Sequence, residues 1–181
     1  MYNSQTSQMV FNQLMNGKVI NQYKLSNSGQ WVTDQYYDEI ISNLADYRQQ
    51  YEMCGYELVE RPGYLFIREI TPNATDLKTD VAMKASLLIL MLAKYMTEHN
   101  YSLLKLTETN GGVTPSDIEA MQEMPDMQEL IEKAKLNSSL LVEIKNVLVN
   151  RNIMLVKPSS EAYILSNAGK AFLEDVIQNF N

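Results

Sequence analysis

The sequence contains little of what metal binding, disulfide formation or membrane insertion requires. It has one cysteine, Cys54, and one histidine, His99, among 181 residues. A single cysteine excludes an internal disulfide, and this pair nearly excludes a tetrahedral zinc site of the usual Cys/His kind. The longest apolar run, residues 87–93, is far shorter than the about 20 residues of a membrane span. With no signal-like N-terminus, we expect a soluble cytoplasmic protein without metal or cofactor.

The sequence also lacks a recognisable catalytic arrangement. Gly111 and Gly112 are not followed by the lysine and hydroxyl residue that a phosphate-binding loop requires. No acidic spacing resembles an EF-hand loop, and His99 lies at the end of a predicted helix without a partner for catalysis. We therefore predict that the protein is not an enzyme and has no catalytic residues.

Charge is unevenly distributed along a chain of net charge −7. The balance argues against a protein that coats nucleic acid by itself. Residues 108–132 carry acids and no base, whereas residues 133–170 carry mostly bases. One interpretation is that the charges match helix dipoles. The other is a basic face that contacts DNA or an acidic partner, formed by Lys133, Lys135, Lys145, Arg151 and Lys157.

One arrangement of elements occurs twice, which is the most informative pattern present. A helical stretch at residues 33–51 leads into strands at 56–60 and 64–68, joined by the strong turn signal Pro62-Gly63. A second helical stretch, residues 127–150, leads into a hairpin at 153–166. A helix followed by a two-stranded wing is the outline of a winged helix-turn-helix module. We predict a mainly α protein with small β-hairpins (α+β), built from tandem winged-helix domains at residues 1–76 and 77–181.

Further elements follow from periodicity and capping signals. Thr33 is the predicted N-cap of the first helical stretch. We expect a buried helix at 79–98, a helix that opens at Thr114-Pro115 and ends at Pro125, and a helix break at 137–139. The other expected segments are loose residues before 7, a short helix at 9–15, an extended segment at 18–20, a loop at 21–30, a connector at 71–78 and a final helix at 168–180.

Two groups of side chains are candidates for contact with a protein partner or a second copy. Tyrosine and tryptophan are favoured at interfaces because they combine apolar area with a polar tip. The alternative is that these aromatic residues form the core and rim of a small module, and the apolar helix could equally be buried within the chain. The candidates are Trp31, Tyr36, Tyr37 and Tyr64, together with Leu87, Leu88 and Met91 from the helix at 79–98.

Several segments resemble the MukE/MksE family of accessory subunits of bacterial condensins. The resemblance lies in residues 16–20, the aromatic helix at 36–51, the strand–Arg61-Pro62-Gly63–strand segment at 56–68, and residues 145–154 and 159–166. It implies a homodimer built from the N-terminal winged helices that binds a kleisin and, through it, an SMC ATPase on DNA. The chain itself would have no ATPase activity and would be nucleoid-associated, supporting DNA loading, condensation and chromosome segregation.

Two alternatives remain open from the sequence. The chain could be a stand-alone winged-helix regulator that binds DNA, which predicts duplex binding that weakens steeply with salt. It could also be the equivalent subunit of a plasmid- or phage-defence SMC system.

Overall fold

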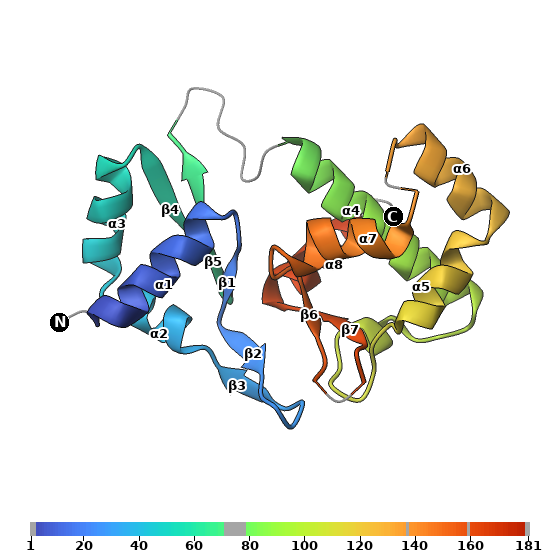
Figure 1. Ribbon diagram of the computed structural model, residues 1–181, viewed down its shortest axis with the longest axis horizontal. Helices are drawn as coiled ribbons and strands as arrows, with labels where there is room; N and C mark the ends of the chain where they lie inside the picture. The colour runs from blue at the N-terminus through green and yellow to red at the C-terminus, as the bar shows by residue number, and fades with distance from the viewer. Residues whose placement is uncertain (1–2, 71–78, 137, 159, 180–181) are drawn as a thin grey trace.

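The chain forms two helical halves that lie side by side, each carrying small antiparallel hairpins (Figure 1). The computed structural model describes residues 3–70, 79–136, 138–158 and 160–179. The N-terminal half is residues 3–70 and the C-terminal half is residues 79–179. The predicted fold class, mainly α with small β-hairpins, is confirmed. The predicted connector at 71–78, and with it the boundary at 76/77, lies outside the described residues.

The N-terminal half begins with a helix that is longer than predicted. Helix α1 (Ser4–Met15) starts at Ser4 because the Asn3 side chain caps it, accepting a hydrogen bond from the Thr6 N–H at 3.0 Å. The prediction that the residues before Ser7 are loose is therefore wrong from residue 4 onward. The remaining elements are β1 (Ile20–Asn21), β2 (Tyr23–Leu25), β3 (Trp31–Thr33), α2 (Gln35–Ser42), α3 (Leu44–Met53), β4 (Tyr56–Arg61) and β5 (Tyr64–Glu69).

The helical stretch predicted at 33–51 is two helices rather than one. Asn43 leaves helical geometry, with φ −128°, and its side chain donates to the Glu39 carbonyl at 3.0 Å. Such a local bond to the backbone competes with helix continuation. The N-cap is Asp34, not Thr33, since the Asp34 carboxylate accepts from the Tyr36 N–H at 2.9 Å. The loop predicted at 21–30 is also corrected, because it contains the end of β1, strand β2 and the turn of the β2–β3 hairpin.

The predicted hairpin at 56–68 is confirmed and belongs to a three-stranded sheet in the order β1–β5–β4. Gly63 has φ +82°, a conformation that glycine adopts without the strain that a side chain would cause. Successive side chains along a strand point to opposite faces of the sheet, so neighbouring residues pack on different sides. Leu58 and Leu65 pack on one face among the N-terminal helices, whereas Val59 and Phe66 pack on the other face in a separate cluster. Both faces of this small sheet are therefore covered.

The C-terminal half is built around α4 (Thr79–Glu98), which the sequence predicted at the same bounds. Pro125 does not end the helix that opens after Thr114. That helix ends at Gln122, and Pro125 instead occupies the first turn of the next one, where proline is favoured. The other elements are η1 (Leu103–Leu106), α5 (Pro115–Gln122), α6 (Pro125–Lys133), α7 (Leu140–Ile144), η2 (Lys145–Val149), β6 (Met154–Val156), β7 (Tyr163–Leu165) and α8 (Asn167–Asn179).

The helix break predicted at 137–139 is confirmed, although Asn137 itself lies outside the described residues. Helix α6 ends at Lys133 and α7 starts at Leu140, with the Ser139 hydroxyl accepting from the Val142 N–H. The second predicted hairpin is also present as β6–β7; of its turn, Ser159 is not described. An isolated antiparallel bridge joins Val113 to Tyr163 beside it.

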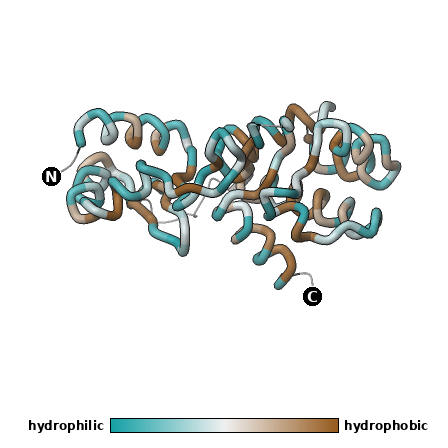
Figure 2. Tube along the Cα trace, turned by 90° about the horizontal axis from the view of Figure 1, so that it is seen from below, coloured by the Kyte–Doolittle hydropathy of each residue, from teal (hydrophilic) through white to brown (hydrophobic). Residues whose placement is uncertain are grey.

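The larger hydrophobic core lies in the C-terminal half, where α4 packs against α8, η1 and η2. Figure 2 shows hydrophobic stretches through the middle of the molecule and hydrophilic stretches along much of its outer edge. Lys84 on α4 forms an ion pair at 2.8 Å with Glu143 of α7, whose side chain is 7% exposed. The expected burial of α4 on several sides is confirmed.

Candidate interaction surfaces

The two halves meet along a polar interface that the sequence did not predict. We call it the seam and define it as residues 17–21 against residues 151–152 and 167–168. The Val19 N–H donates to the Arg151 carbonyl at 3.0 Å. The Asn21 side chain donates to the Asn152 carbonyl at 2.9 Å, and the Asn152 side chain donates in return to the Val19 carbonyl at 3.0 Å. Asn21 is only 4% exposed, so these bonds are shielded from water.

The start of α8 completes the seam from the other side. The Ala168 N–H donates to the Asn21 side-chain oxygen at 3.0 Å, so the Asn21 amide has both a donor and an acceptor satisfied. Ala168 also packs against Val59 and Phe66, on the second face of the N-terminal sheet. Gly63 lies so close to the first residue of α8 that a Cβ on it would be 2.9 Å from the Asn167 side chain. The first hairpin is therefore packed against the C-terminal half.

The predicted basic residues lie in different settings. Arg151 is half-buried in the seam, where its Nη1 donates to the Gly17 carbonyl at 3.3 Å, just beyond the end of α1. A cation suits this negative end of a helix. Lys157 donates to the Gly111 carbonyl at 2.8 Å, and Lys133 forms an ion pair with Glu129 on its own helix. Of the five, Lys133, Lys135 and Lys145 are exposed.

One of the two interpretations of the charge pattern, dipole matching, has a counterpart in the structure. Asp117 and Asp126 lie in the first turns of α5 and α6, and Lys133 lies in the last turn of α6, as dipole matching requires. The three exposed lysines, at the end of α6 and in η2, remain candidates for a basic surface that is smaller than the predicted set of five residues. Arg151 does not belong to that surface, because its guanidinium faces the N-terminal half.

The predicted partner-contact residues divide into surface and core. Trp31 is half-buried, with the Lys170 Nζ 5.0 Å from its ring centroid, and Tyr64 is half-buried and stacks on Phe66. Tyr36 and Tyr37 are half-buried against the N-terminal core, and Leu87 is half-buried on α4. Leu88 and Met91 are 0% exposed within the C-terminal core, so this conformation offers no surface at either position to a partner.

Other apolar side chains are exposed that the sequence analysis did not select. Met9 and Met15 on α1 are 47% and 41% exposed, and Tyr23 and Val32 are exposed on the β2–β3 hairpin. This hairpin could have been predicted from the sequence, because short segments rich in β-forming residues, 23–25 and 31–33, flank the turn Ser26–Gly29. Methionine and aromatic residues are typical of protein interfaces.

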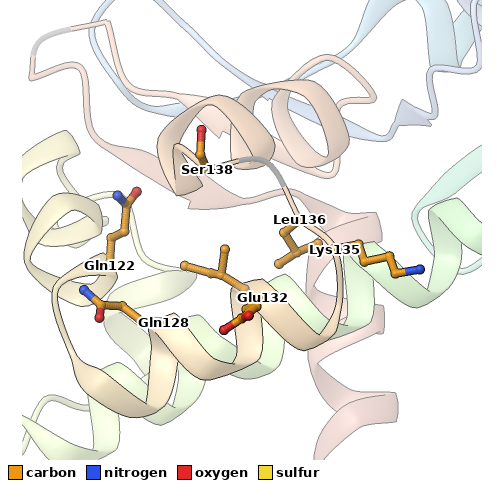
Figure 3. A pocket seen from close by; sticks show the side chains of 7 residues that line it. Gln122, Gln128, Glu132, Lys135, Leu136 and Ser138 are labelled. Atoms are coloured by element: carbon orange, nitrogen blue, oxygen red, sulfur yellow. The ribbon is translucent and has the colours of Figure 1, made fainter.

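A shallow hollow of about 400 Å³ opens between α5, α6 and the start of α7 (Figure 3). Its lining is mixed: apolar Ile131 and Leu136 lie beside the amides of Gln122 and Gln128 and charges of both signs. The Gln122 side-chain oxygen already accepts from the Leu140 N–H at 2.7 Å. In Figure 3 Lys135 extends away from the two glutamines. The hollow therefore contains no convergent set of charged groups. Its lining residues are Gln122, Gln128, Ile131, Glu132, Lys135, Leu136 and Ser138.

Perturbed titratable groups do not gather at one place. Burial raises the pKa of Tyr51 and of Tyr47 in the N-terminal core. On the surface of the other half, the hydrogen bond from Lys94 lowers the pKa of Asp126. Within the described ranges, no group of three or more His, Cys, Asp or Glu side chains is arranged to hold a metal ion. Nor does any helix in the part of the chain described have the length and apolar character to cross a membrane.

Together these features define a mainly helical protein with small β-hairpins that carries individual apolar, aromatic and basic side chains at its surface. A family model described as condensin complex protein MksE matches residues 5–177. The chain therefore belongs to the MksE family of condensin complex proteins, and the resemblance seen in its sequence is confirmed. No curated protein sequence matches it significantly.

Proposed function

We propose that this protein is a non-catalytic accessory subunit of a bacterial condensin-type SMC complex that binds the kleisin subunit. The observation that carries the proposal is the match to the MksE family over residues 5–177, which covers nearly the whole chain. In this role the protein is cytoplasmic and nucleoid-associated. It supports DNA loading and chromosome organisation, while the SMC partner supplies ATPase activity.

The order of elements supports a tandem winged-helix architecture. The N-terminal half runs α1, β1, β2, β3, α2, α3, β4, β5, with β1 paired to β5. The C-terminal half runs α4, η1, the bridge at Val113, α5, α6, α7, η2, β6, β7 and α8. Apart from the β2–β3 hairpin in the first half, and the third central helix and α8 in the second, each half follows the order helix, strand or bridge, helix, helix, strand, strand of a winged helix. We infer one such domain in residues 1–76 and a second in residues 77–181.

The N-terminal half is the proposed site of dimerisation and partner contact. Exposed methionines on α1, and the half-buried Tyr36 and Tyr37, give this half the composition of an interface. Trp31 and Tyr64 of this half remain candidates because each retains exposed surface, and so does Leu87 on α4 of the C-terminal half. Leu88 and Met91 are not included, because they have none.

Affinity purification of the tagged chain from its native cell, followed by mass spectrometry, tests the proposal. We expect a kleisin and a large coiled-coil ATPase to be retained through washes at high salt. Because purely electrostatic contacts are screened at high salt, retention indicates a packed interface. Recovery of the chain alone, or with DNA only, would contradict the proposal and favour the stand-alone regulator.

The exposed lysines carry a separate prediction about DNA. Charge reversal of Lys133, Lys135 and Lys145 to glutamate should abolish retention of DNA by the assembled complex at moderate salt. Removing about three phosphate contacts should also lower the slope of log affinity against log salt by roughly 2–3. Fluorescence anisotropy with labelled duplex DNA over a salt series measures both quantities.

The control for this prediction reverses the same amount of charge in the N-terminal half outside the seam, with Lys24→Glu, Arg48→Glu and Arg68→Glu. All three residues take part in surface ion pairs, which contribute little to stability. Circular dichroism checks that both variants keep their helix content. Equal loss of DNA in the two variants would indicate a non-specific effect of net charge and would discard the basic surface.

A further inference from the structure

The seam differs from the two cores it separates because hydrogen bonds form much of it. The Asn21 side chain donates to the Asn152 carbonyl, the Asn152 side chain donates to the Val19 carbonyl, and the Val19 N–H adds a direct backbone bond to the Arg151 carbonyl. The apolar part is small and consists of Val19, Val59, Phe66 and Ala168. Polar interfaces between parts of one chain allow relative motion more readily than apolar cores do.

Not every hydrogen-bonding group in the seam has a well-placed partner. The Arg151 Nε–H is buried without a hydrogen-bond acceptor among the described residues, and its Nη1 bond to Gly17 is long at 3.3 Å. The bond from Asn152 to the Gln13 side chain is similarly long at 3.4 Å. A buried donor without a partner disfavours the closed arrangement, because water would satisfy it on opening.

The shortest side-chain hydrogen bonds of the seam involve two residues, Asn21 and Asn152. Asn152 has φ +60°, a left-handed conformation that asparagine tolerates better than most residues. This conformation places its side chain to donate to the Val19 carbonyl while its own carbonyl accepts from Asn21. Asn21 in turn accepts from the Ala168 N–H and thereby fixes the start of α8.

We propose that the seam is an intramolecular lock: the hydrogen bonds that Asn21 and Asn152 make across it hold the two halves in one orientation, and their loss lets the halves reorient while each stays folded. Opening uncovers the second face of the first hairpin, with Val59, Phe66 and the half-buried Tyr64. In the closed molecule α8 occupies that face. This inference does not depend on the proposed function.

The chain offers a direct way to measure the lock. Cys54 is the single cysteine of the sequence and is exposed in the N-terminal half. Adding Ser116→Cys, at an exposed position on α5, gives a pair of spin-label sites that reports the distance between the halves. Double electron–electron resonance on the full-length chain then yields the distribution of distances. Amide hydrogen exchange at Val19 and Ala168 gives an independent readout of seam opening.

The test variant combines Asn21→Asp with Asn152→Gly. Aspartate keeps the acceptor for the Ala168 N–H but loses the donor to the Asn152 carbonyl. Glycine keeps the left-handed backbone but loses the side-chain bonds. The control combines Asn100→Gly and Asn146→Asp, both at exposed positions away from the seam, since Asn100 also has positive φ, +57°.

We expect one narrow distance distribution for the original chain and for the control. In the test variant the open population should rise roughly 10-fold or more, since each lost hydrogen bond contributes a factor of about five. Protection of the Val19 and Ala168 amides should fall with it, at unchanged circular dichroism. An unchanged distribution would overturn the proposal, as would a loss of helix content, which would mean that the halves share one cooperative core. Equal broadening in the control would also overturn it.

Discussion

Replacing Leu88 by alanine is expected to lower the free energy of unfolding by about 3 kcal/mol, within the usual 2–5 kcal/mol for a buried leucine. Leu88 is 0% exposed at the centre of α4, where the helix packs against the rest of the C-terminal core. The loss combines the transfer free energy of the removed methyl groups with the cavity left behind. Urea denaturation followed by circular dichroism measures it.

The same experiment separates a core role from a partner-contact role for Leu88. A core substitution lowers stability equally at all protein concentrations, whereas an interface substitution has an effect that varies with concentration. Met83→Ala is the matched control, because Met83 lies on the same helix and is 61% exposed. It should change stability by no more than about 0.5 kcal/mol. A small or concentration-dependent effect of Leu88→Ala would contradict the core assignment.

The second large effect is expected from Gly169→Ala, near the start of α8. A Cβ at this position would be 2.3 Å from the Ile153 carbonyl oxygen and 3.0 Å from the Leu165 side chain. The first contact is with backbone, so relief requires α8 to move away from the β6–β7 hairpin. Such a movement also disturbs the Ser166 hydroxyl, which donates to the same carbonyl at 3.0 Å. We expect a loss of about 3 kcal/mol.

Gly55→Ala provides the comparison for Gly169→Ala. Gly55 has φ +81° and open space where a Cβ would lie, so alanine there meets backbone strain alone. That strain amounts to about 1–2 kcal/mol. Thermal unfolding of both variants measures the difference. If the two substitutions cost the same, close approach between α8 and the hairpin contributes nothing beyond ordinary glycine effects.

Local signals predicted most elements, and their failures have local causes. The Pro62-Gly63 turn between two β-rich segments identified the first hairpin, because proline and glycine restrict the backbone independently of tertiary packing. The helix at 33–51 was wrongly predicted as continuous, because its apolar stripe passes through Asn43 without a break in period. Pro125 was predicted to end one helix, whereas it begins the next, α6. Proline is compatible with both positions, so the residue alone does not distinguish them.

The candidate surfaces were less predictable than the elements. Charge pattern alone grouped Arg151 with the exposed lysines, yet its guanidinium contacts a carbonyl 134 residues away in the sequence. Likewise Leu87 and Leu88 are neighbours on one apolar helix, and only packing shows which of the two retains exposed surface. Membership of the MksE family was recognisable from particular segments, because those segments keep the family's pattern.

The sequence by itself determined the fold class, the positions of both hairpins and the buried central helix, because turn chemistry and apolar periodicity act over a few residues. Only the tertiary structure decided how the halves meet. The seam joins Asn21 to Asn152 and Ala168 through bonds between segments more than 100 residues apart. Local conformational preferences do not specify such a pairing. From the sequence alone, an asparagine in a turn is predicted only as a loop residue, and its hydrogen-bond partner is known only once the distant segment is located.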